Sequence, residues 1–194
     1  MKLCSDNNEI KKRLRNYNPK RVGRRIPVNE NFKSEKLMLY FTKGLTESDP
    51  LDRTYNLLMA ADEIGEEMNV KNYAVCQKGC AYCCKIPVEI TLIEAALISR
   101  ETSKIINSYS TIKKLKRNYS YCPFLDKSNA ICTIYSVRPL ACRSFYSIDH
   151  YKYCKNADVD HLIITMDSNS KWLEIQKLLL ELSHQKMADI REWF

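Results

Sequence analysis

Apolar residues recur at helical spacing in three stretches of the chain. The first stretch, near residues 50–69, begins with Pro50 after Asp49, an order typical of a helix N-terminus. Three of its side chains are expected to face the core: Leu51, Tyr55 and Leu58. Asp62 is the polar exception in this spacing. The stretch is therefore predicted to be an amphipathic helix that carries one carboxylate.

A second helix is predicted over residues 91–117. Thr91 and Glu94 stand three residues apart at its start, the spacing of a capping box in which each side chain binds the other residue's backbone N–H. The apolar residues that follow are Leu92, Ala95, Ala96, Ile98, Ile105, Ile106 and Ile112. The stretch ends in a basic cluster at residues 113–117, and positive charge is favourable at a helix C-terminus.

The third stretch, residues 169–193, is predicted to be a C-terminal helix. It places six large apolar residues on one face, which suits core packing: Trp172, Ile175, Leu178, Leu179, Leu182 and Met187. Residues 162–166 are a candidate short strand, and few other segments alternate as strands do. These patterns favour a mainly α fold.

Positive charge is concentrated near the N-terminus. The net charge is +8, and residues 1–36 carry 11 Lys and Arg against 4 Asp and Glu, whereas residues 37–194 carry 20 against 19. Residues 1–36 are therefore expected to be a basic arm and residues 37–194 a separate domain. Basic residues between 11 and 25 could contact nucleic acid or an acidic protein, although a solvated arm is the simpler interpretation. No apolar run is long enough to span a membrane.

Eight of the nine cysteines lie between residues 76 and 154, in two sets. The first set is Cys76, Cys80, Cys83 and Cys84. Gaps of two or three residues can bring thiolates onto one metal, and Gly79 gives the loop the backbone freedom for so tight a path. In an extended chain the adjacent Cys83 and Cys84 would point in different directions and could serve two centres.

The second set of cysteines lies further along the chain: Cys122, Cys132, Cys142 and Cys154. The two sets supply enough thiols for two four-thiolate sites and leave Cys4 as a bystander. The N-terminus has no apolar segment of the secretory type, so the chain is expected to be cytoplasmic. In that reducing compartment thiol clusters bind metal more often than they form disulfides. We therefore expect a small α-rich domain with irregular cysteine loops organised around one or two metal centres.

Zinc and iron–sulfur clusters both accept four cysteines. The gap of three residues and then two in the first set, and the proline that follows Cys122, favour a 4Fe–4S cluster over zinc. The histidines His150, His161 and His184 lie outside any tight pair and are not nominated as ligands. Four thiolates leave excess negative charge, which the following cations are placed to offset: Lys78, Lys85, Arg138 and Arg143. Arg143 could also bind an anionic substrate, and Arg138 could hold the loop in place.

The cysteine region resembles the YkgJ-type cysteine-cluster family, which is described as zinc- or iron-chelating. The resemblance covers residues 76–154 through CQKGCAYCC at 76–84, IPVEITLIEA at 86–95, CPFLD at 122–126, CTIYSVRPLACRSF at 132–145, and Cys154. It implies metal binding through the eight cysteines. A flagellin lysine methylase has a similar cysteine motif, but this chain has little sequence left for a separate substrate domain.

Several functions remain open from the sequence. The metal centre could support redox or protein-modifying chemistry, and four residues would then be examined first beside it: Asp126, Tyr135, Arg143 and Tyr146. A zinc-stabilised binding module that docks nucleic acid or an acidic partner through the basic arm is an alternative, as is metal storage or delivery. Cys76, Cys80 and Cys83 also fit the radical S-adenosylmethionine spacing, but the helical segments that follow do not suit the α/β barrel of that class.

Overall fold

The computed structural model of the chain describes residues 34–72, 74–76, 80–112, 120–148, 153–154 and 162–194. The α-helices in these ranges are α3 (Glu35–Thr46), α4 (Pro50–Glu67), α5 (Leu92–Thr102), α6 (Leu140–Arg143), α7 (Ser170–Leu182) and α8 (Ile190–Trp193). Strands are few and short in the described part, so the prediction of a mainly α fold is confirmed. None of the described helices is long and apolar enough to cross a membrane.

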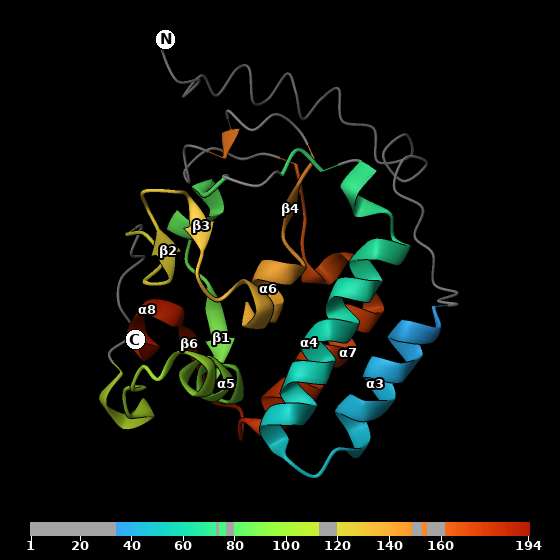
Figure 1. Ribbon diagram of the computed structural model, residues 1–194, viewed down its shortest axis with the longest axis horizontal. Helices are drawn as coiled ribbons and strands as arrows, with labels where there is room; N and C mark the ends of the chain where they lie inside the picture. The colour runs from blue at the N-terminus through green and yellow to red at the C-terminus, as the bar shows by residue number, and fades with distance from the viewer. Residues whose placement is uncertain (1–33, 73, 77–79, 113–119, 149–152, 155–161) are drawn as a thin grey trace.

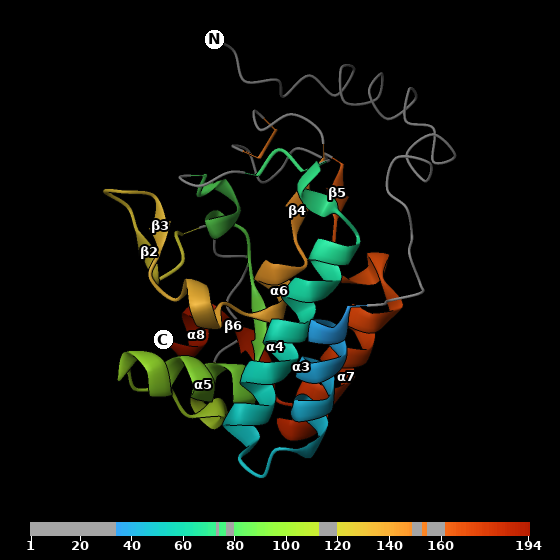
Figure 2. The same cartoon turned by 45° about the vertical axis from the view of Figure 1, so that its right-hand side comes forward.

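Helix α4 lies at the centre of the packing and contacts α3, α5, α6 and α7. It begins as predicted, with Pro50 in the first turn and the Asp49 side chain accepting a hydrogen bond of 2.9 Å from the backbone N–H of Leu51. Leu58 is buried as expected, whereas Tyr55 is 38% exposed, because it falls beside the buried stripe of this helix and not on it. Helices α3, α4 and α7 run side by side in both views (Figures 1 and 2).

Helix α3 was not predicted from the sequence. It presents Met38, Leu39 and Leu45 to solvent, so its apolar residues do not form one stripe. Gly44 brings it close to α4, since a Cβ there would lie 2.6 Å from the Cδ2 atom of Leu57. The expected boundary between residues 36 and 37 falls within the first turn of this helix. Residues 1–33, most of the expected basic arm, lie outside the described residues.

Helix α5 has the predicted capping box but is shorter than expected. The Thr91 backbone N–H donates to Glu94 at 2.8 Å and the Glu94 N–H donates to Thr91 at 3.4 Å. The helix ends at Thr102 because Ser103 adopts the left-handed conformation, with φ 57°. The backbone beyond it bonds elsewhere: the Asn107 N–H donates to the Trp193 carbonyl oxygen at 2.9 Å. The prediction of one helix to residue 117 is therefore confirmed for Leu92–Thr102 and wrong for residues 103–112, and residues 113–117 lie outside the described residues.

The C-terminal region is two helices and a strand, not the single predicted helix. Helix α7 buries Trp172, Ile175 and Leu179 as expected. It ends before His184 and Gln185, which both have positive φ. The chain then forms strand β6 (Met187–Asp189) and turns into α8.

Pairs of short antiparallel strands complete the described fold. Strand β1 (Glu89–Thr91) pairs with β6, with Ile90 opposite Ala188. Strand β2 (Leu125–Asp126) pairs with β3 (Ile131–Cys132), and β4 (Tyr146–Ser147) pairs with β5 (Ile163–Ile164). Strand β5 confirms the strand expected within residues 162–166. The β2–β3 hairpin lies across the molecule from α3, near α5 and α8 (Figures 1 and 2).

Candidate metal centre

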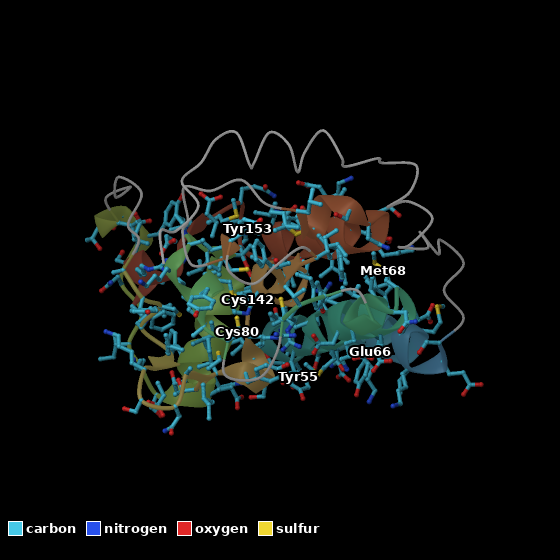
Figure 3. The ribbon with its side chains drawn as sticks, turned by 90° about the horizontal axis from the view of Figure 1, so that it is seen from above. Tyr55, Glu66, Met68, Cys80, Cys142 and Tyr153 are labelled. Carbon is cyan, nitrogen blue, oxygen red and sulfur yellow. The ribbon has the colours of Figure 1, made fainter. Side chains whose placement is uncertain are left out.

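All eight predicted ligands lie on described residues, and every one is at least partly accessible. Cys4 lies outside the described residues. The thiols sit on short elements and not in the helical core. Figure 3 looks down on the end of the molecule that carries these elements, and the labelled Cys80 and Cys142 lie near the middle of that view.

Two cysteines of the first set lie on a short helical turn. The 3₁₀ helix η2 (Tyr82–Lys85) contains Cys83 and Cys84, whose side chains share a hydrogen bond. This bond, with the partial loss of water around the sulfur, raises the pKa of Cys83. The sequence expectation for these two side chains assumed an extended chain, whereas the chain is 3₁₀-helical here. Cys76 is held separately, by a bond of 3.4 Å from the backbone N–H of Ser147 to its Sγ atom.

The second set is joined to the first by the backbone. The N–H of Cys122 donates to the carbonyl oxygen of Cys84 at 2.8 Å. Cys122 then leads into the β2–β3 hairpin, where Cys132 pairs with Leu125. The short helix α6 follows with Cys142. Cys154 stands next to Tyr153, whose side chain is buried.

Four thiols drawn from both sets influence one another electrostatically, and we call them the central thiols: Cys83, Cys122, Cys132 and Cys142. Burial raises the pKa of Cys142, and the charges of the other three central thiols raise it further. The pKa values of Cys122 and Cys132 are raised first by burial and then by a neighbouring central thiol. These thiols are therefore neighbours that keep their protons when no metal is bound.

Cys76 is also influenced by neighbouring thiols of the first set. Burial raises the pKa of Cys76, and the charges of Cys83 and Cys80 add to the effect. Among the described residues, however, no three His, Cys, Asp or Glu side chains are arranged closely enough to hold one metal ion. The fold thus gathers the cysteine segments without closing a ligand set.

Arg143 is buried and connects α6, which carries Cys142, to α4. Its side chain is 1% exposed and forms an ion pair with Asp62, the polar residue on the predicted apolar helix. Its other nitrogens donate to the carbonyl oxygens of Arg138 at 2.7 Å and Ser136 at 2.6 Å. The guanidinium of Arg143 is therefore engaged by Asp62 and two carbonyl oxygens.

Arg138 lies over the Tyr135 ring, with its guanidinium carbon 4.4 Å from the ring centroid, and one nitrogen reaches Asp62 at 3.4 Å. Its Nε atom is buried and has no hydrogen-bond partner among the described residues. The charge of Arg138 lowers the pKa of Cys76, Cys132 and Cys142, against the larger effect of burial. A buried donor without an acceptor is costly, and a negatively charged metal–thiolate group would supply one.

The other residues selected from the sequence have structural contacts. Asp126 accepts hydrogen bonds from Ser128 and Asn129 in the hairpin turn, which lower its pKa. Tyr146 stacks on Trp172, and burial raises its pKa to about 12. Lys85 lies over the Tyr121 ring at 4.6 Å. Lys78, His150 and His161 lie outside the described residues, and His184 is exposed at the end of α7.

Two carboxylates important for this end were not recognised from the sequence as site residues. Asp62 binds Arg138 and Arg143, and its signal was a polar residue at a helical position otherwise filled by apolar ones. Glu94, seen only as a cap, also accepts from the N–H of Leu140 at 2.9 Å, at the start of the helix that carries Cys142. Burial raises the pKa of Glu94.

The donor set fits zinc or iron. Thiolates are soft ligands that select these metals in proteins, and carboxylates of the magnesium or calcium type are absent from the predicted set. Once bound, such a centre would supply either structural cross-linking, as zinc does, or electron transfer, as an iron–sulfur cluster does. The orphaned Nε of Arg138 matches the excess negative charge that four thiolates leave on either metal.

Comparison with known proteins gives one match. Residues 75–161 match the model of the CxxCxxCC family, described as "Putative zinc- or iron-chelating domain". The matched residues include all eight cysteines from Cys76 to Cys154. No curated protein and no solved structure matches the chain. The matched segment agrees with the resemblance found from the sequence at residues 76–154. Residues 75–161 of this chain are thus similar to the domain that the CxxCxxCC model describes as zinc- or iron-chelating.

Proposed function

We propose that the eight cysteines bind metal in four-thiolate centres, and that the central thiols Cys83, Cys122, Cys132 and Cys142 form one of them. The observation that carries the proposal is the backbone bond of 2.8 Å from the Cys122 N–H to the Cys84 carbonyl oxygen, which joins the two cysteine sets. Burial raises the pKa of Cys142, and the charges of Cys83, Cys122 and Cys132 raise it further, which points to these four side chains as neighbours. The remaining thiols, Cys76, Cys80, Cys84 and Cys154, are then available for a second centre. The spacing of the first set favours 4Fe–4S over zinc.

Anaerobic purification with metal analysis and an absorbance spectrum tests the metal. A brown protein with a broad band near roughly 400 nm and about four irons per centre supports 4Fe–4S. A colourless protein with about one zinc per four thiols supports zinc. Protein that takes up neither metal contradicts the proposal.

Cysteine variants test the assignment of ligands. Cys142→Ser should remove the central site and leave the second site loaded, so metal content should fall to about half, since a four-thiolate site rarely survives the loss of a ligand. Cys4→Ser is the matched control and should keep full metal content. Full metal content in Cys142→Ser would remove Cys142 from the ligand set.

The central site also favours a structural or electron-transfer role over radical chemistry. A radical S-adenosylmethionine cluster uses three cysteines and leaves one iron open, whereas the central thiols supply four. Redox activity is tested by reversible bleaching of the absorbance with dithionite. A centre that does not bleach supports the alternative of a zinc-stabilised binding module.

A further inference from the structure

Arg191, near the end of the chain, contacts both cysteine sets through their backbones. The residue lies in α8, outside the matched segment 75–161, and its side chain is 5% exposed. Its Nη2 atom donates to the carbonyl oxygen of Cys84 at 2.9 Å and to that of Ile86 at 3.1 Å. Its Nε atom donates to the carbonyl oxygen of Ser120 at 2.9 Å. One guanidinium therefore connects the segment Cys84–Ile86, at the end of the first cysteine set, to Ser120, just before the second set.

The acceptors of Arg191 lie directly beside predicted ligands. The Cys84 carbonyl oxygen accepts from Arg191 and also from the N–H of Cys122. Ser120 is two residues before Cys122, so the bond to its carbonyl fixes the approach of that cysteine from the other side. The Cys84 carbonyl oxygen thus accepts two bonds, one from the backbone of Cys122 and one from the side chain of Arg191. Together these bonds hold Cys84 and Cys122 next to each other.

The C-terminal strand and helix hold Arg191 in place. Its Nη1 atom is paired with both oxygens of Asp189, at 3.0 and 3.1 Å. Asp189 also caps α8 and accepts from the N–H of Val88 at 2.8 Å, while β6 pairs with β1. The guanidinium is therefore oriented before any metal binds, by contacts to the strand that follows the first cysteine set.

We propose that Arg191 is a positioning residue for the metal centre, which sets the distance between the Cys84 and Cys122 segments through their carbonyl groups. This inference rests on the proposed metal-binding function. It also means that the matched segment needs the C-terminal β6–α8 element of the same chain to assemble its ligands. A lysine cannot replace the arginine, because one ammonium group cannot span carbonyls on two segments as a planar guanidinium does.

The experiment compares full-length wild-type protein with Arg191→Gln, Arg191→Lys and the control Arg100→Gln. Arg100 is also an ion-paired arginine, but it binds Asp49 and Asp52 on the surface at 3.3 and 3.0 Å. In metal-free protein, alkylation of each cysteine is followed by mass spectrometry. We expect Cys84 and Cys122 to react several-fold faster in both Arg191 variants, while Cys76, which is held by Ser147, keeps its wild-type rate.

Metal binding provides the second measurement. Cobalt(II) titration with a competing chelator should show about 10- to 100-fold weaker binding in the Arg191 variants, with altered intensity of the thiolate-to-cobalt bands. Arg100→Gln should match the wild type. Unchanged alkylation of Cys84 and Cys122 in folded Arg191→Lys overturns the inference, as does wild-type metal affinity.

The two proposals fail in different ways. If wild-type protein binds no metal, the proposed function fails, but alkylation of the metal-free protein still tests the role of Arg191. If Arg191→Gln does not fold, Arg191→Lys keeps the charge and the pair with Asp189, and its alkylation pattern decides the question. Equal acceleration at all the cysteines, including Cys76, indicates general loosening and also overturns the inference.

Discussion

In the helical half, formed by α3, α4, α5 and α7, long helices bury apolar side chains such as Leu57, Ile98 and Trp172 completely. The cysteine end, formed by η2, the β2–β3 hairpin, α6 and the segments around the eight cysteines, has strands of two residues and helices of a single turn. Elements that short bury few apolar side chains each, although Phe124, Ile134, Val137 and Leu140 from this end join the core. The cysteine end therefore draws less of its stability from apolar burial than the helical half does.

A few polar residues connect this end to the rest of the molecule. Asp62 and Arg143 join α4 to α6, Glu94 joins α5 to α6, and Arg191 joins α8 to the two cysteine sets. Each of these links is buried or half-buried, and each holds backbone groups near a predicted ligand. The helical half is therefore held mainly by apolar burial, while the cysteine end relies more on these links and, under the proposed function, on metal.

The largest expected effect is the pH dependence of metal binding. The pKa values of Cys122, Cys132 and Cys142 are raised above 9.0, so these thiols are protonated near pH 7 and must lose protons to bind metal. Affinity should therefore rise with pH and be lost as pH falls. A four-thiolate site gains up to about 10⁴-fold per pH unit, equal to about 5 kcal/mol. Chelator competition from pH 6.5 to 8 measures this.

The metal-free protein should respond in the opposite direction. Above pH 9.0, the ordinary thiol pKa, the unfolded chain loses protons that the folded thiols retain, so the free energy of unfolding should fall as pH rises. The helical half contributes no such dependence, and Cys142→Ser should reduce it. Metal affinity that stays flat between pH 6.5 and 8 would contradict the assignment of protonated thiols as ligands.

The next effect separates the two regions by mutation of the core. Trp172 is fully buried in α7, and its indole N–H donates to the Ala61 carbonyl oxygen at 2.9 Å. Trp172→Ala should lower the free energy of unfolding of the metal-free protein by about 3–5 kcal/mol, because it leaves a cavity and removes this hydrogen bond. Urea unfolding followed by circular dichroism measures the loss.

Leu45→Ala is the matched control for the core mutation. Leu45 is 45% exposed on α3, so its replacement should change the free energy of unfolding by less than about 0.5 kcal/mol. Metal stoichiometry at saturation should remain unchanged in folded Trp172→Ala. Loss of metal from folded Trp172→Ala would show that metal binding at the cysteine end depends on the packing of the helical core.

Local signals in the sequence predicted the helix starts but not all of the helix ends. Asp49 before Pro50, and Thr91 with Glu94, act within one turn, so their effect is visible in a few residues. The ends depend on left-handed residues that are not glycine, Ser103 after α5 and His184 after α7. Residues other than glycine adopt this conformation rarely, so the sequence pattern does not mark these helix ends.

The candidate site shows the same division. The number and spacing of the cysteines were enough to predict metal binding, which the family match supports at the level of zinc or iron. Which thiols become neighbours depends on tertiary contacts, such as the backbone bond between Cys122 and Cys84. Arg191 was missed because its partners lie more than 70 residues earlier, 107 in the case of Cys84. No short motif identifies such a residue.

The smallest expected effect concerns the link between the two regions. Arg143→Met removes the buried guanidinium, leaves two carbonyl oxygens without this donor, and leaves Asp62, which is 35% exposed, with Arg138 as its remaining partner. Losing one partner of a fully buried ion pair costs about 3–5 kcal/mol, and the exposure of Asp62 reduces the expected loss to about 2 kcal/mol. Urea unfolding of the metal-free protein measures the change.

A second replacement shows whether the charge or the geometry of this link matters. Asp62→Asn keeps an acceptor for Arg143 but removes the negative charge, so it should cost less than Arg143→Met. Arg143→Met, which frees the carbonyls of Ser136 and Arg138, should also weaken metal binding at Cys142, because it releases α6 from α4. If Arg143→Met lowers stability without changing metal affinity, Arg143 joins the two regions but does not position the ligands. Positioning of the ligands would then rest on the links made by Glu94 and Arg191.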